Sequence, residues 1–441
     1  MKTIEQRTSP LRGEVTVPGD KSISHRAVMF GSIARGNTEI SGFLPGADCL
    51  STVDCFRRLG VEIDTDVQRG RVTVHGKGMR GLCPASDPVD LYTGNSGTTT
   101  RIMSGILAPQ HFTSVVSGDA SISARPMRRV ILPLSLMGAS ITSINGNDCA
   151  PLRIEGRGLH GITYQSPVAS AQVKSSILCA GLYAEGITEV IEPSLSRDHT
   201  ERMLRSFGAD IESFEGKDGW HARTSFCPEL SARRISVPGD ISSAAYFIAA
   251  ASLVPGSEVL IRNVGINPTR AGIIDIAVRM GADITMLNIR NDAEPSADLL
   301  VRHAPLHGVT FGGSVIPTLI DEIPAIAVIA AAAEGTTCIR DAAELKVKET
   351  DRITTISENL KAMGGTVFPN EDGLVIEGCG AGSGPALKGA LIRTGGDHRI
   401  AMAFSVAALI AEGQTTIDDE HCADVSYPGF YRDLNALSNT H

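Results

Sequence analysis

The sequence predicts an α/β (α+β) protein built from two similar domains. Two observations carry this prediction: a tetrapeptide that recurs about halfway along the 441-residue chain, and two short glycine patterns that recur in step with each other. The tetrapeptide stands at Val17–Asp20 and again at Val237–Asp240, and each copy opens an apolar stretch rich in small residues, which is typical of a helix start. A chain that repeats itself near its midpoint indicates two like domains.

The first glycine pattern closes an apolar run and leads into residues of alternating polarity. We interpret it as a helix stopped by a glycine in the left-handed conformation, followed directly by a strand. The glycines of this pattern are Gly36, Gly186, Gly256, Gly335 and Gly413.

The second glycine pattern closes an amphipathic helix and enters a strand. Its glycines are Gly60, Gly138, Gly208, Gly281 and Gly364. Ordinary α/β alternation with chance similarity is the simpler alternative, but it does not explain why the two patterns stay in step. We therefore expect six repeats of roughly 70 to 80 residues, three in each half, with two helices and several strands in each repeat.

Composition narrows the class of protein without naming a function. A chain of 441 residues exceeds the size at which a single core stops growing, which again favours two domains. Nine cysteines without a Cys-x-x-Cys pair are typical of reduced thiols, and no long uncharged apolar run or signal peptide is evident, so we expect a cytoplasmic location. A net charge of −9 and only 4% aromatic residues argue against a nucleic-acid partner, although local arginines still suit a small anion.

The first group of candidate anion-binding residues follows the first copy of the tetrapeptide. Ser22 and Arg26 share one helix face, and Lys21 with Arg26 can grip a phosphate over the exposed amides of the helix start. The group is not a Walker A loop, because Asp20 separates Gly19 from the lysine. Taken alone, it fits a solvated helix start equally well.

Further groups of this kind follow in the first half of the chain. Small residues around Asn95 and Gly97 allow a close approach of the backbone to a ligand, and Arg125 stands in a segment without acidic residues. The small polar run Ser170–Gln172 offers a wall of hydrogen-bonding groups, or else an ordinary helix cap. Asp198 and its neighbouring histidine lack a third metal ligand at suitable spacing, so no metal site is expected.

The second half adds acids as well as arginines. Asp321 precedes a helix so apolar that it must be buried, where a carboxylate is also stabilised by the helix dipole. Lys348 and Arg352 fall on one helical face and repel each other unless an anion, or Glu349, lies between them. Arg399 stands in a glycine-preceded turn before another apolar helix.

Taken in order along the whole chain, these motifs resemble one family closely, 5-enolpyruvylshikimate-3-phosphate (EPSP) synthase, also called 3-phosphoshikimate 1-carboxyvinyltransferase. The resemblance implies the enolpyruvyl transferase fold, an inside-out α/β barrel of two domains, each with three βαβαββ units around a pseudo-threefold axis. It places residues 21–238 in one domain and residues 1–20 and 239–441 in the other. The active site is expected in the interdomain cleft.

The resemblance also implies the reaction. The enolpyruvyl group of phosphoenolpyruvate passes to the 5-hydroxyl of shikimate 3-phosphate and phosphate leaves, on the shikimate pathway to chorismate and the aromatic amino acids. No cofactor and no metal are expected. The implied partners are the two substrates and the inhibitor glyphosate, with neither nucleic acid nor membrane, on a monomeric protein.

Residue roles are carried over from the family motifs. Asp321 is implied as the base for the hydroxyl, and Glu349 and Lys21 as the groups that move protons at phosphoenolpyruvate. The residues implied for shikimate 3-phosphate are Lys21, Ser22, Arg26, Ser170, Ala171, Gln172, Arg197, Asp321 and Lys348. Those implied for phosphoenolpyruvate are Lys21, Asn95, Gly97, Arg125, Gln172, Arg352 and Arg399.

Two departures from the pattern of one branch of the family point to its other branch. Val425 stands where a lysine contacts phosphoenolpyruvate, and Glu344 replaces an asparagine. One alternative is the sister enzyme UDP-N-acetylglucosamine enolpyruvyl transferase, whose reactive cysteine corresponds to Ala120 here. The other is a non-catalytic anion-binding protein, in which the two carboxylates Asp321 and Glu349 would not be expected.

Overall fold

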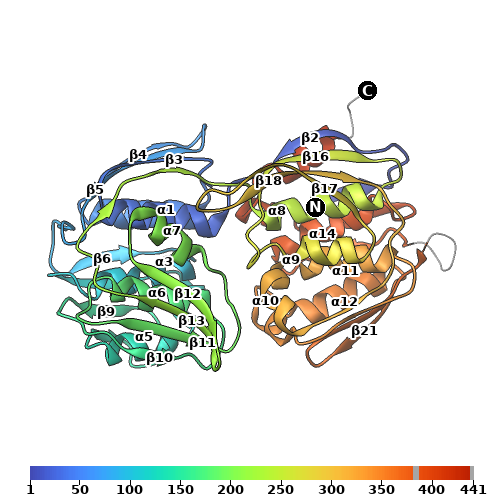
Figure 1. Ribbon diagram of the computed structural model, residues 1–441. Coiled ribbons are helices and arrows are strands. Elements are labelled where there is room, and N and C mark those ends of the chain that lie inside the picture. The colour runs from blue at the N-terminus through green and yellow to red at the C-terminus, as the bar shows by residue number, and fades with distance from the viewer. Residues whose placement is uncertain (381–386, 438–441) are drawn as a thin grey trace. The chain divides into compact units, whose positions relative to one another are not determined.

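The chain forms two compact units. A computed structural model describes residues 1–380 and 387–437. Its contacts divide the chain into one unit of Gly19–Val237 and another of Met1–Pro18 with Pro238–His441. Each unit holds its own hydrophobic core, and each is described by itself below (Figure 1).

The unit Gly19–Val237 shows the repeat most plainly in its middle and last thirds. The middle repeat consists of β6 (Val89–Tyr92), α3 (Gly97–Leu107), β7 (Thr113–Ser117), α5 (Arg128–Leu136), β8 (Ser140–Ser143) and β9 (Leu152–Glu155), with the short α4 (Ala120–Ala124) before α5. The last repeat consists of β10 (Thr163–Gln165), α6 (Ala171–Gly181), β11 (Thr188–Glu192), α7 (His199–Phe207), β12 (Ile211–Gly216) and β13 (Gly219–Thr224). Their sheets have the orders β6-β7-β9-β8 and β10-β11-β13-β12, in which only the first pair of strands is parallel.

The first repeat of this unit takes its leading strand from the end of the unit. It contains α1 (Lys21–Ile33), β3 (Ala34–Ser41), α2 (Ala47–Arg58), β4 (Glu62–Asp66) and β5 (Arg71–Lys77). The parallel partners of β3 are β14 (Leu230–Ser231) and β15 (Arg234–Ser236). The sheet therefore has the same order as the other two, although its first strand comes last in the sequence.

The second unit repeats this plan and takes two strands from the N-terminus. Its first repeat holds β2 (Arg12–Thr16), α8 (Ile241–Leu253), β16 (Glu258–Gly265), α9 (Gly272–Arg279), β17 (Asp283–Arg290) and β18 (Ser296–Arg302). Its second holds β19 (Thr310–Phe311), α10 (Ile316–Leu319), α11 (Ile323–Ala332), β20 (Thr336–Ile339), α12 (Arg352–Ala362), β21 (Thr366–Asn370) and β22 (Gly373–Glu377). Its third holds β23 (Leu391–Ile392), α14 (His398–Ala408), β24 (Gln414–Ile417), α15 (Phe430–Ala436) and β1 (Lys2–Glu5). The predicted fold class, with its βαβαββ repeats, is confirmed.

The two glycine patterns have different structural roles. Gly208 is the left-handed cap of α7, and Gly60 has the same positive φ after α2, so the second pattern ends helices as predicted. Gly36 and Gly186 are also left-handed, but α1 already ends at Ile33 and its cap residue Ala34 is extended. The prediction that the first pattern caps a helix is therefore wrong. Gly36 lies inside β3 and Gly186 lies just before β11, so these glycines belong to the strand or to its entry and not to the helix end.

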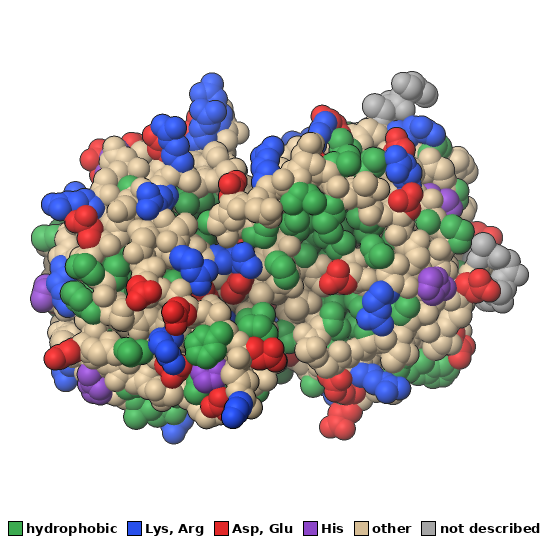
Figure 2. All heavy atoms as spheres, viewed as in Figure 1, with side chains coloured by type: hydrophobic (Ala, Val, Ile, Leu, Met, Phe, Trp, Pro, Cys, Tyr) green, Lys and Arg blue, Asp and Glu red, His purple; other side chains and the backbone are tan. Residues whose placement is uncertain are grey.

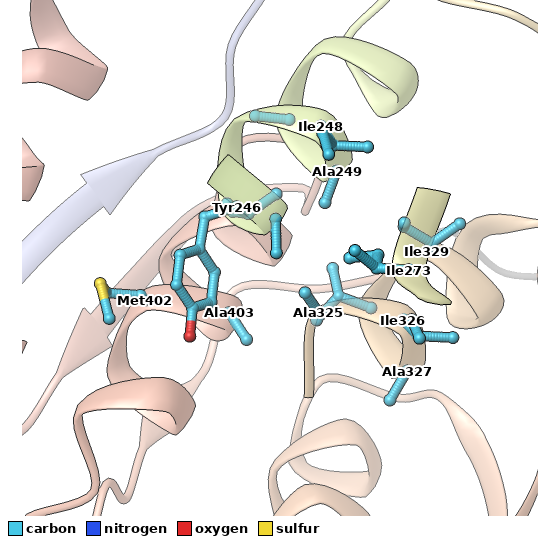
Figure 3. Close-up of a cluster of buried hydrophobic side chains, with 14 of the residues drawn as sticks. Tyr246, Ile248, Ala249, Ile273, Ala325, Ile326, Ala327, Ile329, Met402 and Ala403 are labelled. Carbon is cyan, nitrogen blue, oxygen red and sulfur yellow. The ribbon is translucent and has the colours of Figure 1, made fainter. Parts of the chain in front are cut away.

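Buried helices fill the interior of each unit. All 13 residues of α8 are buried, and α11 is buried except at its last residue. Figure 3 shows how small side chains allow this packing, with Ala325 of α11 and Ala403 of α14 beside the larger Tyr246 of α8. Gly313–Ala332 is long and apolar enough to pass for a membrane span, but 72% of that stretch is buried inside the protein, as in a core helix.

The surface carries both signs of charge. On the face in Figure 2, Lys and Arg side chains are scattered among Asp and Glu side chains. The edge strand β17 exposes Met286, Leu287 and Ile289, and hydrophobic side chains gather in the region of β17 and β18 in the same view. Isolated apolar side chains on a surface are normal, so this strand alone indicates no function.

Replacing Gly105 by alanine tests the packing of α3 against α6. A Cβ at this position would lie 2.0 Å from the carbonyl oxygen of Ser176, so two backbones would have to separate. We expect Gly105→Ala to lower the free energy of unfolding by about 1–3 kcal/mol, measured by urea denaturation. Gly158→Ala is the matched control, because a Cβ at Gly158 meets nothing within 4 Å. Equal stabilities of the two variants would contradict this packing.

Candidate active site

Three buried helices of the unit Gly19–Val237 begin at the same end of the unit, and predicted site residues stand at their starts. Lys21 begins α1, Gly97 begins α3 and Ala171 begins α6. Their N-terminal parts are in contact, since Arg26 Nη2 of α1 donates to Ser175 Oγ of α6 at 2.9 Å, and Gln172 Nε2 of α6 donates to Thr98 Oγ1 of α3 at 3.2 Å. The positive ends of three helix dipoles therefore lie close together, which favours an anion.

Some polar side chains at these helix starts are used as helix caps, and others are not and can bind a ligand. Asp20 accepts the N–H of Ile23 at 2.9 Å, and Ser96 accepts the N–H of Thr99 at 3.1 Å. Ser170 makes no such cap bond with its side chain, and its own N–H donates to Glu192 Oε1 at 2.7 Å. The helix-cap interpretation thus holds for Ser96 but not for Ser170.

Arg26 and Lys21 are held differently. The buried Arg26 donates from Nε to Thr200 Oγ1 at 2.7 Å and from Nη1 to the Ser22 carbonyl at 3.0 Å. Lys21 forms an ion pair with Asp48 in the first turn of α2. An anion that binds Lys21 must therefore compete with Asp48, a residue that the sequence pattern did not single out.

Asn95, Gly97 and Arg125 come together at the start of α3, as expected. Arg125 Nη2 donates to Asn95 Oδ1 at 2.9 Å and to Ser121 Oγ at 3.0 Å. A Cβ at Gly97 would lie 3.5 Å from Arg125 Nη1 and only 2.9 Å from Arg101 Nη1. The absence of a side chain at Gly97 thus leaves room for two guanidinium groups.

Arg101 is a neighbour of this group that sequence reasoning missed. It lies on α3, and its Nη1 donates to Gln172 Oε1 at 2.5 Å. Gln172 Nε2 in turn donates to Thr98 Oγ1 at 3.2 Å. The sequence contained a signal for Arg101, which directly follows the run of small residues around Gly97. The contact with Gln172 could not be predicted, because the two residues lie far apart in the sequence.

A buried ion triad supports the start of α6. Lys174 Nζ lies 2.9 Å from Glu192 Oε2 and 2.8 Å from Glu201 Oε1, and it donates to the Ser196 carbonyl at 3.3 Å. Burial alone would lower the pKa of Lys174, but the two glutamates outweigh it and the pKa is raised. The triad fixes Ser170 through Glu192 and holds the turn that carries Arg197.

The other unit gathers its predicted residues around Asp321. Asp321 Oδ1 lies 3.5 Å from Lys348 Nζ and 3.6 Å from Arg352 Nη1, and Oδ2 lies 3.9 Å from Arg399 Nη2. Burial works against the charge of Arg399, but Asp321 and other neighbours raise its pKa. The structure thus brings one carboxylate together with three cations, a combination that suits anionic ligands.

Arg352 is fully buried (0% exposed) and joins two acids. Its Nε donates to Asp397 Oδ2 at 2.8 Å, and its Nη2 donates to Glu349 Oε2 at 2.6 Å. Burial raises the pKa of both carboxyl groups, but the guanidinium outweighs it, so the pKa of Glu349 and that of Asp397 are lowered. Arg352 Nη1 has no hydrogen-bond partner within the described part of the chain, which leaves a donor for a ligand.

The adjacent acids Asp321 and Glu322 have separate roles that their sequence did not distinguish. Glu322 is buried and accepts two hydrogen bonds from Arg270 Nη1, both at 2.8 Å, and a third from Ser242. These contacts join the start of α8 to the start of α11. Glu322 is therefore mainly structural, although its Oε1 also lies 3.6 Å from Arg399 Nη1, whereas Asp321 lies near all three cations of the candidate site.

The two departures from the motif lie at the edge of this group or outside it. The exposed Glu344 pairs with Lys348, with Oε1 3.0 Å from Nζ. Val425 is exposed in the turn before α15 and brings no charge. Elsewhere, on β4 and β5, donor atoms of Glu62, Asp64 and His75 lie within 4.8 Å of one another, an exposed grouping that was not predicted.

Comparison with known proteins decides the family. The family model described as EPSP synthase (3-phosphoshikimate 1-carboxyvinyltransferase) matches residues 5–434. The chain belongs to the EPSP synthase family. The alternative of the sister enzyme UDP-N-acetylglucosamine enolpyruvyl transferase is therefore set aside. The family is the one that the sequence motifs resemble.

Curated relatives and solved structures agree with the EPSP synthase assignment over nearly the whole chain. The 3-phosphoshikimate 1-carboxyvinyltransferase of Brevibacillus brevis is 56% identical, covering 98% of this chain and 99% of the relative. That of Geobacter sp. strain M21 is 52% identical over 98% of both chains. The EPSP synthase structure from Acinetobacter baumannii has a TM-score of 0.91 at 46% identity, covering 99% of this chain and 97% of that one. The enolpyruvyl transferase NikO from Streptomyces tendae shares the fold. Its structure has a TM-score of 0.78 at 22% identity, covering 99% of this chain and 97% of that one.

His398 makes a testable contribution to stability. Burial, together with Arg399, lowers the pKa of His398 to about 4, whereas an unfolded histidine titrates near 6.5. The unfolded state therefore takes up a proton first as the pH falls, and stability present above pH ~6.5 is lost toward pH ~4. We expect wild-type protein to lose about 2 kcal/mol more than His398→Gln between pH 7.5 and 5, measured by urea denaturation.

The exposed His111 provides the control, since His111→Gln should keep the wild-type pH dependence. An unchanged pH dependence in His398→Gln would contradict the buried neutral state of this imidazole.

Proposed function

We propose that the two sets of site residues act together on shikimate 3-phosphate and phosphoenolpyruvate, the substrates of the EPSP synthase family. The observation that carries the proposal is the grouping of Asp321 with Lys348, Arg352 and Arg399, at 3.5 to 3.9 Å. It places a carboxylate suited to accept a proton beside cations suited to hold anions. The unit Gly19–Val237 contributes further cations at three helix starts.

The reaction balances with these groups alone. Asp321 takes the proton of the 5-hydroxyl while the hydroxyl oxygen attacks the C2 atom of phosphoenolpyruvate. Lys21 or Glu349 delivers a proton to the methylene carbon. The resulting tetrahedral intermediate loses phosphate, and removal of a methyl proton restores the double bond. The addition and the elimination each need only proton transfer and the stabilisation of developing charge. The proposed mechanism therefore uses no cofactor and no metal.

Arginine forks suit the anionic groups of phosphoenolpyruvate. Arg125, Arg352 and Arg399 each present a planar guanidinium, which matches carboxylate and phosphate oxygens. Arg352 Nη1 lies in an ion pair with Asp321 but has no hydrogen-bond partner among the described residues, which supports this assignment, because a buried donor without a hydrogen bond costs free energy that a ligand oxygen recovers.

Shikimate 3-phosphate carries a phosphate and hydroxyl groups. For its phosphate we propose Arg26 with Ser170, Ala171 and Arg197, and for its hydroxyls Gln172 and Asp321, with Lys21, Ser22 and Lys348 beside them. The side chain of Ser170 is not used as a helix cap, which supports its role toward substrate. The nine cysteines are all free thiols, which supports a reducing, cytoplasmic location. We also propose that the enzyme is a monomer.

Phosphate release tests the function and the two carboxylates. Phosphate should appear from phosphoenolpyruvate only when shikimate 3-phosphate is present, and not with UDP-N-acetylglucosamine. Asp321→Asn and Glu349→Gln should each lower kcat by roughly 10²-fold or more, because each removes a group that moves a proton.

Glu358→Gln, on the exposed face of α12, is the matched control and should keep the wild-type kcat. A near-normal kcat in either site variant would return that carboxylate to a structural role, and turnover with the UDP-sugar would overturn the proposed acceptor.

Inhibition by glyphosate tests the role of Gly97. We propose that glyphosate, which is longer than phosphoenolpyruvate, occupies the same place. Adding one methyl to a tightly packed site costs on the order of 1–3 kcal/mol, so Gly97→Ala should raise the glyphosate inhibition constant roughly tenfold or more. The KM for phosphoenolpyruvate should rise less. Inhibition that is not competitive with phosphoenolpyruvate would contradict the shared site.

A further inference from the structure

Arg101 is a buried cation whose surroundings call for an anion. Its side chain is 4% exposed, and its Nε has no hydrogen-bond partner in the described residues. None of the ion pairs formed within that part of the chain includes Arg101. Burial, with the like charges of Arg129 and Arg125, lowers the pKa of Arg101 to about 9, which still leaves it charged at neutral pH.

This arrangement destabilises the unit in the absence of a ligand. A structural arginine in a core normally faces a carboxylate, as Arg270 faces Glu322 in the other unit. Arg101 instead has two other arginines as its charged neighbours. Such a cluster is compensated when a polyanion binds next to it.

The contact with Gln172 gives Arg101 a second effect. An amide has one acceptor and one donor end, and the 2.5 Å bond from Arg101 Nη1 to Oε1 fixes which end is which. The Nε2 donor end then lies on the side of Thr98 Oγ1, 3.2 Å away, at the start of α3. One N–H of Nε2 is used by Thr98, and the second N–H remains as a donor for a ligand.

We propose that Arg101 is a positioning residue for phosphoenolpyruvate. Its guanidinium fixes the Gln172 amide with an N–H donor toward the anion, and it adds a positive charge to those of Arg125 and Arg129. This inference rests on the proposed function of the site. Arg101 acts through Gln172 and through its charge, and it takes no part in proton transfer.

The same geometry connects Arg101 with position 97. A methyl group at Gly97 would lie 2.9 Å from Arg101 Nη1, too close for the guanidinium to stay in place. A side chain at position 97 therefore displaces Arg101 as well as filling space. Its effect on ligands should depend on the residue at position 101.

Steady-state kinetics of Arg101→Lys test the lock. Lysine keeps the charge but is shorter and lacks the planar fork, so it does not hold the amide. We expect KM for phosphoenolpyruvate to rise about tenfold, while kcat and KM for shikimate 3-phosphate change less than about threefold. In a Gln172→Ala background, Arg101→Lys should change KM for phosphoenolpyruvate less than about twofold, because the partner is already absent.

A second Arg→Lys substitution tests whether the effect is specific to position 101. Arg128→Lys alters an exposed arginine of the same segment, whose Nη1 pairs with Asp148 at 3.2 Å, and should leave all kinetic constants unchanged. If Arg101→Lys does not fold, Thr98→Val tests the other end of the amide, and Thr98→Ser is its control. Thr98→Val should raise KM for phosphoenolpyruvate about threefold relative to Thr98→Ser.

Two outcomes would overturn the proposal. One is a wild-type KM for phosphoenolpyruvate in Arg101→Lys or in Thr98→Val. The other is an equal effect of Arg101→Lys with and without Gln172, which would show that the amide is not the route. Arg125→Lys separates this failure from that of the proposed function. If Arg125→Lys raises KM for phosphoenolpyruvate and Arg101→Lys does not, only the present inference fails.

Discussion

The candidate site depends on one constraint, the common end at which the buried helices of each unit begin. Helix starts carry unsatisfied N–H groups, so each needs a cap or a ligand. The repeated tetrapeptide supplies equivalent caps, because Asp20 caps α1 and Asp240 caps α8 through the N–H of Ser242 at 2.8 Å. Asp397 caps α14 in the same way while it also binds Arg352. The midpoint repeat is thus a repeat of helix caps.

The two units differ in how particular buried arginines are compensated, although the unit Gly19–Val237 also pairs its buried Lys174 with Glu192 and Glu201. In one, Arg352 and Arg270 are paired with Asp397 and Glu322, so the charges there are balanced before any ligand arrives. In the other, Arg101 lies near further arginines without a carboxylate in an ion pair among the described residues. The first arrangement holds side chains in a fixed geometry, and the second creates a positive potential.

Local patterns made the fold predictable, because glycine and helix-start signals act within a few residues. The left-handed Gly208 after α7 and the cap residue Asp20 follow from such signals. The partners of Lys174 were not predictable, since Glu192 and Glu201 reach it from β11 and α7 only after folding. The same holds for Arg101 with Gln172, and for Asp48 with Lys21. Sequence therefore named most candidate ligands, whereas the residues that hold them in place came from the structure.

The strands taken from the N-terminus set an order for biosynthesis. β1 pairs with β24, in which Lys2 lies opposite Ile417, and β2 pairs with β16. The unit Gly19–Val237 has all its strands once Ser236 has left the ribosome, and domains generally fold as units during synthesis. Of the N-terminal strands, β2 can pair once β16 (Glu258–Gly265) has been made, whereas β1 has no partner until β24 (Gln414–Ile417) has been synthesised. During translation, the nascent chain thus carries the unpaired β1 beside an already folded unit, and a strand made late in synthesis completes the sheet that holds one of the first.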